Sequence, residues 1–261
     1  MLFGMDWALA IYVLAVVFII GLVMGSFLNC AAMRIARGES FVKGRSHCMK
    51  CGHQLGILDL FPLFSWLFLG GKCRYCKEKI SARYPVTELI MGLMSVACVV
   101  LEDFTWLTLR NWLFICLLFL VSLVDLEIQE IPNWCVIAMA GIWGATVALM
   151  DAPISELTGG LIAGAAFGIG ILLLALLMDK LLKKNTLGGG DIKLIAACGL
   201  YLGVMKSLFM LVIACIVGLG MSIVLKKDSE MHFAFGPAIA IATAFMLLAG
   251  GPLVSWYMGL F

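Results

Sequence analysis

Long apolar stretches separated by short polar ones dominate the pattern of this chain. Most of these stretches have the length, about 20 residues, that an α-helix needs to cross the hydrocarbon core of a bilayer. The stretch 192–204 is shorter, so we expect it to be tilted or partly re-entrant. The pattern predicts an all-α polytopic membrane protein with about eight transmembrane helices. The apolar stretches lie at residues 7–33, 85–101, 106–124, 134–150, 157–182, 192–204, 207–225 and 233–250.

Residues 34–85 form the one sizeable polar segment, and positive charge gathers in it. Residues 34–83 contain ten of the 18 lysines and arginines but only three acidic residues, Glu39, Asp59 and Glu78. Basic loops of membrane proteins stay in the cytosol, which explains this charge without a nucleic-acid partner, and a basic cytosolic face attracts anionic lipid headgroups. No lysine or arginine precedes the first apolar stretch, so we expect no cleavable signal peptide and an outside N-terminus.

Composition agrees with a polytopic membrane protein, since 63% of the residues are hydrophobic, 13% are charged and the mean hydropathy is +1.09.

With residues 34–85 in the cytosol, the connections at 125–133, 179–190 and 226–232 also face the cytosol, and those at 102–105 and 151–156 face outside. The inside connections carry Lys180, Lys183, Lys184, Lys226 and Lys227, the outside ones carry Glu102, Asp103, Asp151 and Glu156, and Arg110 and Lys206 are exceptions.

Two aspartates stand where apolar stretches meet this cytosolic side. Asp191 follows Gly188, Gly189 and Gly190, and Asp125 ends the stretch 106–124. Glycines allow sharp turns and close approach, and ionisable groups at membrane segments usually serve a function. Two neighbouring carboxyl groups can share a proton and act as base and acid in hydrolysis. An interfacial or helix-capping role is the alternative for each aspartate.

Other charged residues near the aspartates could share their role. Glu127 and Glu130 could each replace Asp125 as the partner of Asp191. Lys193 follows Asp191 by two positions, so on a helix it points away from that side chain, toward lipid phosphate or a substrate. In the stretch 157–182, glycines recur at every fourth residue from 160 to 168, which favours close helix packing.

Two C-x-x-C pairs, Cys48 with Cys51 and Cys73 with Cys76, lie in the basic segment. Their spacing is typical of a zinc site with four thiolates, which is structural because the coordination shell is full. Disulfides are the alternative, although a reducing cytosol disfavours them. His47 and His53 could substitute as ligands, and we interpret the other six cysteines as small buried apolar residues.

Taken in order, these motifs resemble the type IV prepilin peptidases, and the resemblance covers nearly the whole chain. It rests on Gly-Ser-Phe-Leu-Asn at 25–29, both cysteine pairs, Arg-Tyr-Pro-Val-Thr-Glu at 83–88, Asp125 with Ile-Pro-Asn at 131–133, and Gly-Gly-Gly-Asp-Ile-Lys at 188–193. Met49 and Ala36 depart from the family pattern, in which prolines are usual, and affect only local loop shape.

The resemblance implies a multi-pass protein of the bacterial inner membrane that acts as a G-x-G-D aspartic endopeptidase. Asp125 and Asp191 would be its catalytic residues, with residues 188–190 and Lys193 in the catalytic loop. The substrates would be prepilins or pseudopilins of type IV pilus or type II secretion systems, cut at the cytosolic face behind a basic leader. The new N-terminal residue would then be methylated with S-adenosylmethionine as donor.

Several features stay open in the sequence. No nucleotide-binding glycine motif identifies where the methyl donor binds. A transporter or channel that uses the aspartates as proton or ion sites is the alternative function, and an assembly protein without catalysis is a third. We expect a first transmembrane segment at 1–33, a zinc-ribbon-like cytosolic module at 34–85, and a membrane-embedded protease domain at 86–261.

Overall fold

The computed structural model describes residues 6–42, 44–149, 152–183, 187–224 and 234–260. Lys43, Asp151, Lys184, Lys226 and Lys227, on which part of the expected charge pattern rests, lie outside these ranges. The chain divides into two compact units, Met1–Phe104 and Thr105–Phe261. The domain boundaries expected after residues 33 and 85 separate segments by function, not by how compactly they pack. These boundaries remain a prediction.

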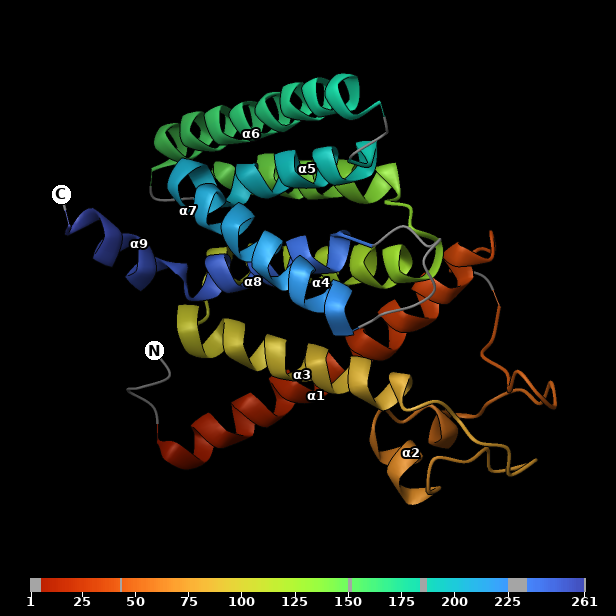
Figure 1. Cartoon of the computed structure of the whole chain (residues 1–261). Helices are drawn as coiled ribbons and strands as arrows, with labels where there is room; N and C mark the ends of the chain where they lie inside the picture. Colours follow the sequence, from red (N-terminus) through yellow and green to blue (C-terminus); the bar gives the residue numbers. More distant parts are fainter. Residues whose placement is uncertain (1–5, 43, 150–151, 184–186, 225–233, 261) are drawn as a thin grey trace. The chain divides into compact units, whose positions relative to one another are not determined.

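The first unit pairs two long helices, α1 (Trp7–Ala36) and α3 (Arg83–Glu102) (Figure 1). Glycines let them pack closely, since a Cβ atom added at Gly21 would lie 2.7 Å from the Cα atom of Gly92. The basic segment between them forms loops, the 3-10 helix η2 (Ile57–Asp59) and the short helix α2 (Phe64–Phe68). Isolated antiparallel bridges, His47 with Gln54 and Lys72 with Lys79, mark the two cysteine turns.

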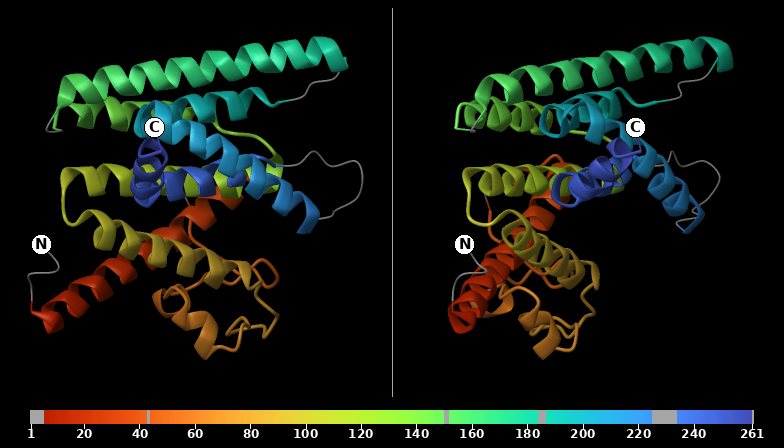
Figure 2. Two further views of the ribbon diagram at one scale, coloured as in Figure 1. Left: turned by 60° about the vertical axis from the view of Figure 1, so that its left-hand side comes forward. Right: turned by 90° about the vertical axis from the view of Figure 1, so that its left-hand side faces the viewer.

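The second unit consists of helices joined by short connections. They are α4 (Trp106–Ile128), α5 (Asn133–Val147), α6 (Pro153–Leu182), α7 (Gly189–Val224), α8 (Gly236–Leu248) and α9 (Gly250–Met258). Helix α6 runs along the first part of α7, and α8 packs against both α7 and α4 (Figure 2). Because α8 contacts both helices that carry the candidate aspartates, its first residues are well placed to reach them.

Helix α7 breaks at Gly203 and turns back on itself (Figures 1 and 2). Gly203 has φ of 69° and ψ of −179°, a backbone conformation that residues with a Cβ atom rarely adopt. The break falls near the end of the apolar stretch expected at residues 192–204. The two stretches expected at 192–204 and 207–225 are therefore the two arms of one bent element.

Among the described residues, five helices are long and apolar enough to cross a membrane, or six if the bent pair α8 and α9 counts as one span. The sequence pattern predicts about eight spans. The counts differ because α5 is a shorter apolar helix, α8 reaches the required length only together with α9, and the two arms of α7 count as one element. The all-helical, multi-pass architecture is confirmed.

Close packing at the α6 glycines is also confirmed. A Cβ atom at Gly160 would lie 2.6 Å from the carbonyl oxygen of Leu200, and one at Gly164 would lie 3.1 Å from that of Ala196. On the facing helix, a Cβ atom at Gly199 would lie 2.9 Å from the Cα atom of Gly164. Helices α6 and α7 thus approach with their backbones almost in contact.

A buried aromatic cluster fixes the helices that carry the aspartates. The rings of Phe114 on α4 and Tyr201 on α7 are stacked, with centroids 3.7 Å apart and planes at 3°. The Tyr201 hydroxyl donates a hydrogen bond of 2.7 Å to the carbonyl oxygen of Met139 on α5. The guanidinium of Arg110 lies 5.5 Å from the centre of the Tyr201 ring, within the range of a cation–π contact.

Candidate active site and metal centre

Asp125 lies in the last turn of α4, and its side chain is buried. Only 5% of the residue is exposed. The backbone amide of Gly236, the first residue of α8, donates a hydrogen bond of 2.9 Å to its Oδ2 atom. The first amides of a helix have no partner within the helix and carry its positive end, so they suit a carboxylate. This bond orients the Asp125 carboxyl group and leaves Oδ1 available.

Asp191 lies in the first turn of α7, directly after the glycines. A Cβ atom at Gly188 would lie 3.1 Å from the Asp191 Oδ2 atom, and one at Gly190 would lie 3.0 Å from the Ile131 Cβ atom. A Cβ atom at Gly189 would meet no atom within 4 Å. The outer two glycines therefore serve close approach, one to the aspartate and the other to the turn that follows α4.

The structure brings the two aspartates of the second unit together. Their carboxyl groups interact electrostatically, although 66 positions separate them in the sequence. The alternative partners do not share this environment, because Glu127 and Glu130 are exposed whereas Asp125 is buried. Asp125 is thus the better partner for Asp191 in a shared site.

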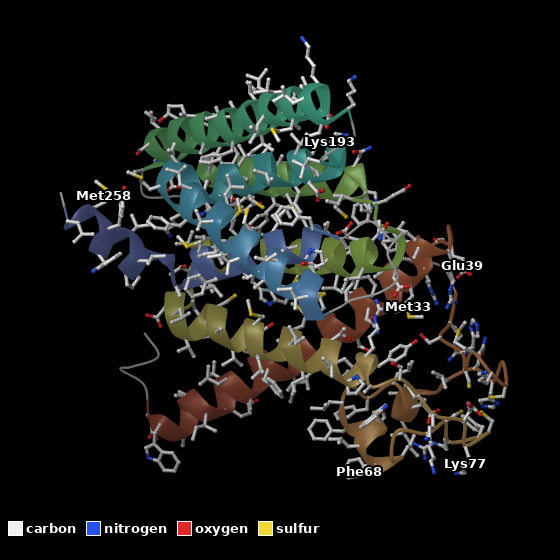
Figure 3. All side chains as sticks on the ribbon, viewed as in Figure 1. Met33, Glu39, Phe68, Lys77, Lys193 and Met258 are labelled. Carbon is white, nitrogen blue, oxygen red and sulfur yellow. The ribbon has the colours of Figure 1, made fainter. Side chains whose placement is uncertain are left out.

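Lys193 bonds to an asparagine on α5. Its Nζ atom donates a hydrogen bond of 2.9 Å to Oδ1 of Asn133, at the start of α5; Figure 3 labels Lys193 on α7. Together with the contact of Gly190 on Ile131, this bond joins the glycine turn to the turn between α4 and α5. The contact with Asn133 was not expected from the sequence, which suggested lipid phosphate or a substrate for this lysine.

Gly236 is the site residue that sequence reasoning missed. It is 111 positions from Asp125, so no local pattern links the two. A local signal for the amide alone is present, because Gly236 and Pro237 begin an apolar helix and the first amides of a helix have no partner within it. The sequence therefore indicates a free helix start but not its partner.

In the first unit, the two cysteine turns have the same backbone design. The Cys48 amide bonds the His53 carbonyl oxygen, and the Cys73 amide bonds that of Glu78, each at 2.9 Å. The residue after each pair has a positive φ angle, 69° at Gly52 and 59° at Lys77. Figure 3 labels Lys77 in this second turn. Such paired turns present both sulfur atoms of a pair on one side.

The four sulfur atoms of Cys48, Cys51, Cys73 and Cys76 lie within 4.8 Å of one another. Those of Cys48 and Cys76 are 3.8 Å apart. Tetrahedral zinc holds sulfurs about 3.8 Å from each other, given its Zn–S bonds of about 2.3 Å. All ten cysteines are free in this structure. The group fits a metal ion with four thiolate ligands.

The two histidines near the first cysteine turn lie outside this group. The metal-site geometry includes the four cysteines only. The His53 ring packs against the Tyr75 ring, with centroids 3.6 Å apart and planes at 34°. The cysteines are therefore the better ligand set.

The thiols of this group differ in acidity. The backbone amides of Cys51 and Lys50 lower the Cys48 pKa to about 6, which favours the thiolate form that binds metals. The amide of Glu78 acts to lower the pKa of Cys76, but desolvation and hydrogen bonds with the other three thiols raise it to about 11. Without a metal, the group thus holds its protons unevenly.

Asp59 ties the apolar loop to the second cysteine turn. Its Oδ1 atom accepts a hydrogen bond of 2.6 Å from Arg74, and its Oδ2 atom accepts one of 3.1 Å from Tyr75. The bond from Arg74 is the main reason that the Asp59 pKa is lowered. The loop and the second cysteine turn are therefore folded against each other.

Comparisons with known proteins identify the family of this chain. Residues 19–101 match the Bacterial Peptidase A24 N-terminal domain, and residues 112–223 match the Type IV leader peptidase family. The chain is 31% identical over 280 residues to a prepilin leader peptidase/N-methyltransferase of Aeromonas hydrophila, covering 94% of this chain and 93% of the relative. The chain belongs to the type IV leader peptidase family.

Further relatives carry the same description. A prepilin leader peptidase/N-methyltransferase of Bacillus subtilis (strain 168) is 32% identical over 250 residues, which is 94% of this chain and 98% of the relative. A type 4 prepilin-like proteins leader peptide-processing enzyme of Escherichia coli O78:H11 is 32% identical over 249 residues, or 85% and 88% of the two chains. No solved structure matches the chain. The resemblance that the sequence motifs indicate is therefore confirmed. The chain is a multi-pass membrane protein of a bacterial family.

Proposed function

We propose that this protein cuts the leader peptide from prepilins or pseudopilins with Asp125 and Asp191 as a catalytic pair, and then methylates the new N-terminus. The observation that carries this proposal is the second unit's pair of aspartates, which interact electrostatically with each other. A structural role would require no second carboxyl group nearby. Membership of the peptidase family supports the same reading.

Peptide hydrolysis by such a pair follows from its proton content. Two carboxyl groups that interact with each other can share one proton, so that one acts as base and the other as acid. The base takes a proton from a water molecule, whose oxygen attacks the scissile carbonyl carbon. The acid protonates the carbonyl oxygen, and the departing amine then takes up a proton as the C–N bond breaks.

The hydrogen bond from Gly236 suggests which aspartate acts as the base and which as the acid. It engages Oδ2 of Asp125 and holds that carboxyl group in one orientation. Asp125 can therefore present Oδ1 to the water while Asp191, in the first turn of α7, faces the peptide. Glycine before the cut site would let an extended substrate backbone fit between the two side chains.

We place this chemistry at the cytosolic face of the inner membrane. The basic segment 34–83 argues for a cytosolic loop, and counting spans from there puts both aspartates on the same side. A substrate whose apolar helix remains in the bilayer would present its leader junction at this interface, where water is available. The basic leader itself would meet the anionic lipid surface.

The cysteine group holds structural zinc in this proposal. Zinc bound by four thiolates has no open position for a substrate, so its role is to stabilise the module. S-adenosylmethionine supplies the methyl group, which it carries on a positively charged sulfur. The glycine motif of nucleotide-binding turns is absent from the sequence, so the donor needs another kind of site.

A cleavage assay tests the proposal. Purified protein in detergent is incubated with a prepilin and S-adenosylmethionine, and the products are weighed by mass spectrometry. We expect a product that has lost its leader and gained one methyl group, and only intact substrate from Asp191→Asn. If the folded wild-type protein leaves the substrate intact but conducts ions in liposomes, the transporter alternative is correct.

A further inference from the structure

A buried hydrogen bond joins α7 to α8 about two helical turns away from the aspartates. The Thr243 hydroxyl donates it to the Sγ atom of Cys198, at 3.3 Å. Both residues are fully buried. The mechanism proposed above uses neither of them, and the sequence suggested only a small apolar role for the cysteine. The bond is therefore a further polar contact inside the unit that carries the aspartates.

The direction of this hydrogen bond differs from that of other hydroxyl groups in the chain. The hydroxyls of Ser95, Ser122 and Thr146 each donate to a carbonyl oxygen one turn earlier in the same helix. Such a bond satisfies the hydroxyl without involving another element. Thr243 instead donates to a neighbouring helix. Its contact therefore depends on how α8 lies against α7.

The bond lies equally far along both helices from the aspartate pair. Thr243 comes seven positions after Gly236, whose amide bonds Asp125, and Cys198 comes seven positions after Asp191. Seven residues of a helix span about 10 Å, or about two turns. The first arm of α7 and α8 therefore run side by side in the same direction from the aspartates. A shift of α8 along α7 would move the Gly236 amide away from its carboxylate by the same amount.

Apolar side chains make up almost all of α8, so the hydroxyl of Thr243 has particular weight. Thr243 is the single polar side chain in the sequence of this helix, and alanines occupy every second position from 238 to 244. Apolar contacts are non-directional, and alanine side chains are too small to interlock deeply. A hydrogen bond, in contrast, requires a defined distance and angle. The Thr243 hydroxyl thus gives α8 a directional contact along α7.

The first arm of α7 is itself held in place by two other helices. A Cβ atom at Gly199 would lie 2.9 Å from the Cα atom of Gly164 on α6, so the two backbones are almost in contact. The Tyr201 ring is stacked on the Phe114 ring of α4, with centroids 3.7 Å apart. Cys198, next to these residues, therefore has a defined position relative to α4.

We infer that Thr243 is a positioning residue for the aspartate pair. Its hydrogen bond to Cys198 sets the position of α8 along α7, and so keeps the Gly236 amide in contact with Asp125. The inference deepens the cleavage mechanism proposed above and rests on it. Because Thr243 lies two turns away from the reacting groups, loss of its hydroxyl should lower kcat and leave KM unchanged.

Cleavage by Thr243→Val tests this inference, because valine keeps the shape of the side chain and removes the hydroxyl. The measurement is the single-turnover rate of the purified full chain on a prepilin, with KM measured separately. We expect a rate about tenfold lower, since a full displacement of about 1 Å can cost about 100-fold. Thr243→Ser keeps the hydroxyl and should cleave close to the wild-type rate. A Thr243→Val protein as active as the wild type overturns the inference.

Thr146→Val is the matched control. It makes the same chemical change in another helix of the second unit, where the hydroxyl donates to the Ile142 carbonyl oxygen within α5. We expect it to cleave at the wild-type rate. A loss equal to that of Thr243→Val would show that any buried hydroxyl of this unit matters alike, which overturns a positioning role for Thr243.

A double-mutant cycle separates positioning from a general effect on stability. If Thr243 acts through the Gly236 amide, Thr243→Val should cost no further activity once Gly236→Ala has displaced that amide. Losses that add would show that Thr243 acts elsewhere in the fold, and they overturn the inference.

Variants of the acceptor test the same bond from α7 and take over if Thr243→Val does not fold. Cys198→Ala removes the acceptor and should slow cleavage about as much as Thr243→Val. Cys198→Ser retains an acceptor and should cleave closer to the wild-type rate. Equal rates for these two variants, in preparations of equal thermal stability, overturn the inference.

These results separate the role of Thr243 from the proposed function. A folded wild-type protein that does not cleave a prepilin contradicts the proposed function itself. A wild-type protein that cleaves, beside an equally active Thr243→Val protein, contradicts only the positioning role.

Discussion

The backbone amide of Gly236 donates a 2.9 Å hydrogen bond to the Oδ2 atom of Asp125, across 111 positions of the sequence. A side chain at position 236 would destroy this contact, since a Cβ atom there would lie only 2.7 Å from that oxygen. The position thus couples the start of α8 to the orientation of a proposed catalytic group.

Gly236→Ala should therefore slow leader cleavage while leaving most of the fold intact. The displaced carboxyl group would no longer meet the water and peptide correctly, and a misplacement of about 1 Å can cost about 100-fold in rate. The measurement is the single-turnover cleavage rate at saturating enzyme. Gly251→Ala, where an added Cβ atom meets nothing within 4 Å, serves as the control. A Gly236→Ala enzyme that cleaves at the wild-type rate would show that this amide has no role in positioning.

Lys193 and Asn133 should act as one unit. Their hydrogen bond joins the glycine turn to the start of α5, and both side chains are exposed, so its contribution is modest. We expect Lys193→Met and Asn133→Ala each to reduce cleavage severalfold, and the double variant to be no worse than either. The double-mutant cycle measures this coupling directly. Additive losses would mean that Lys193 instead contacts the substrate or lipid.

Removing the metal should unfold the cysteine module first. Four thiolates at these separations have no other partner strong enough to hold the two turns together, and metal binding contributes directly to folding in such modules. We expect one zinc per chain in the purified protein and a lower thermal midpoint after chelation or in Cys48→Ser. The same stoichiometry in wild type and a Cys48→Ser, Cys51→Ser variant would contradict the four-thiolate site.

Lys77 has a strained backbone conformation, whereas Gly52, at the equivalent position of the first cysteine turn, does not. Both cysteine turns require a positive φ angle after the second cysteine, and Gly52 supplies it without strain whereas Lys77 does not. Lys77→Gly should therefore stabilise the module by about 1 kcal/mol, and Gly52→Ala should destabilise it by a similar amount. Protection of the module from limited proteolysis, measured for both variants, tests this pair of opposite effects. A Lys77→Gly module that is cut faster than wild type would rule out strain at this position.

Much of this architecture could be predicted because it depends on local patterns. The apolar stretches fix the helices, and the spacing of the cysteines fixes a four-sulfur group that the structure forms. The glycines before Asp191 predicted a turn of close approach, which the contact of Gly190 with Ile131 fulfils. In each case the relevant residues are neighbours in the sequence or repeat at a helical period.

Other features could not be predicted because they depend on which helices pack together. The link between Gly236 and Asp125 exists only because α8 lies against α4. The bond between the Leu63 amide and Glu88 joins a loop to a helix 25 positions away. The reversal at Gly203 was also hidden, since the apolar pattern shows where a stretch stops but not that the helix folds back on itself.

The proposed mechanism requires Asp125 and Asp191 to work as a pair. Single and double aspartate-to-asparagine variants measure this most directly, with prepilin cleavage rates compared in preparations of equal thermal stability and Glu127→Gln as the control for a nearby exposed acid. Residues that act as a unit give non-additive losses, so we predict that each single variant loses activity about as completely as the double variant, by at least about 1,000-fold. Substantial cleavage by either single variant would contradict the pair and remove that aspartate from the mechanism.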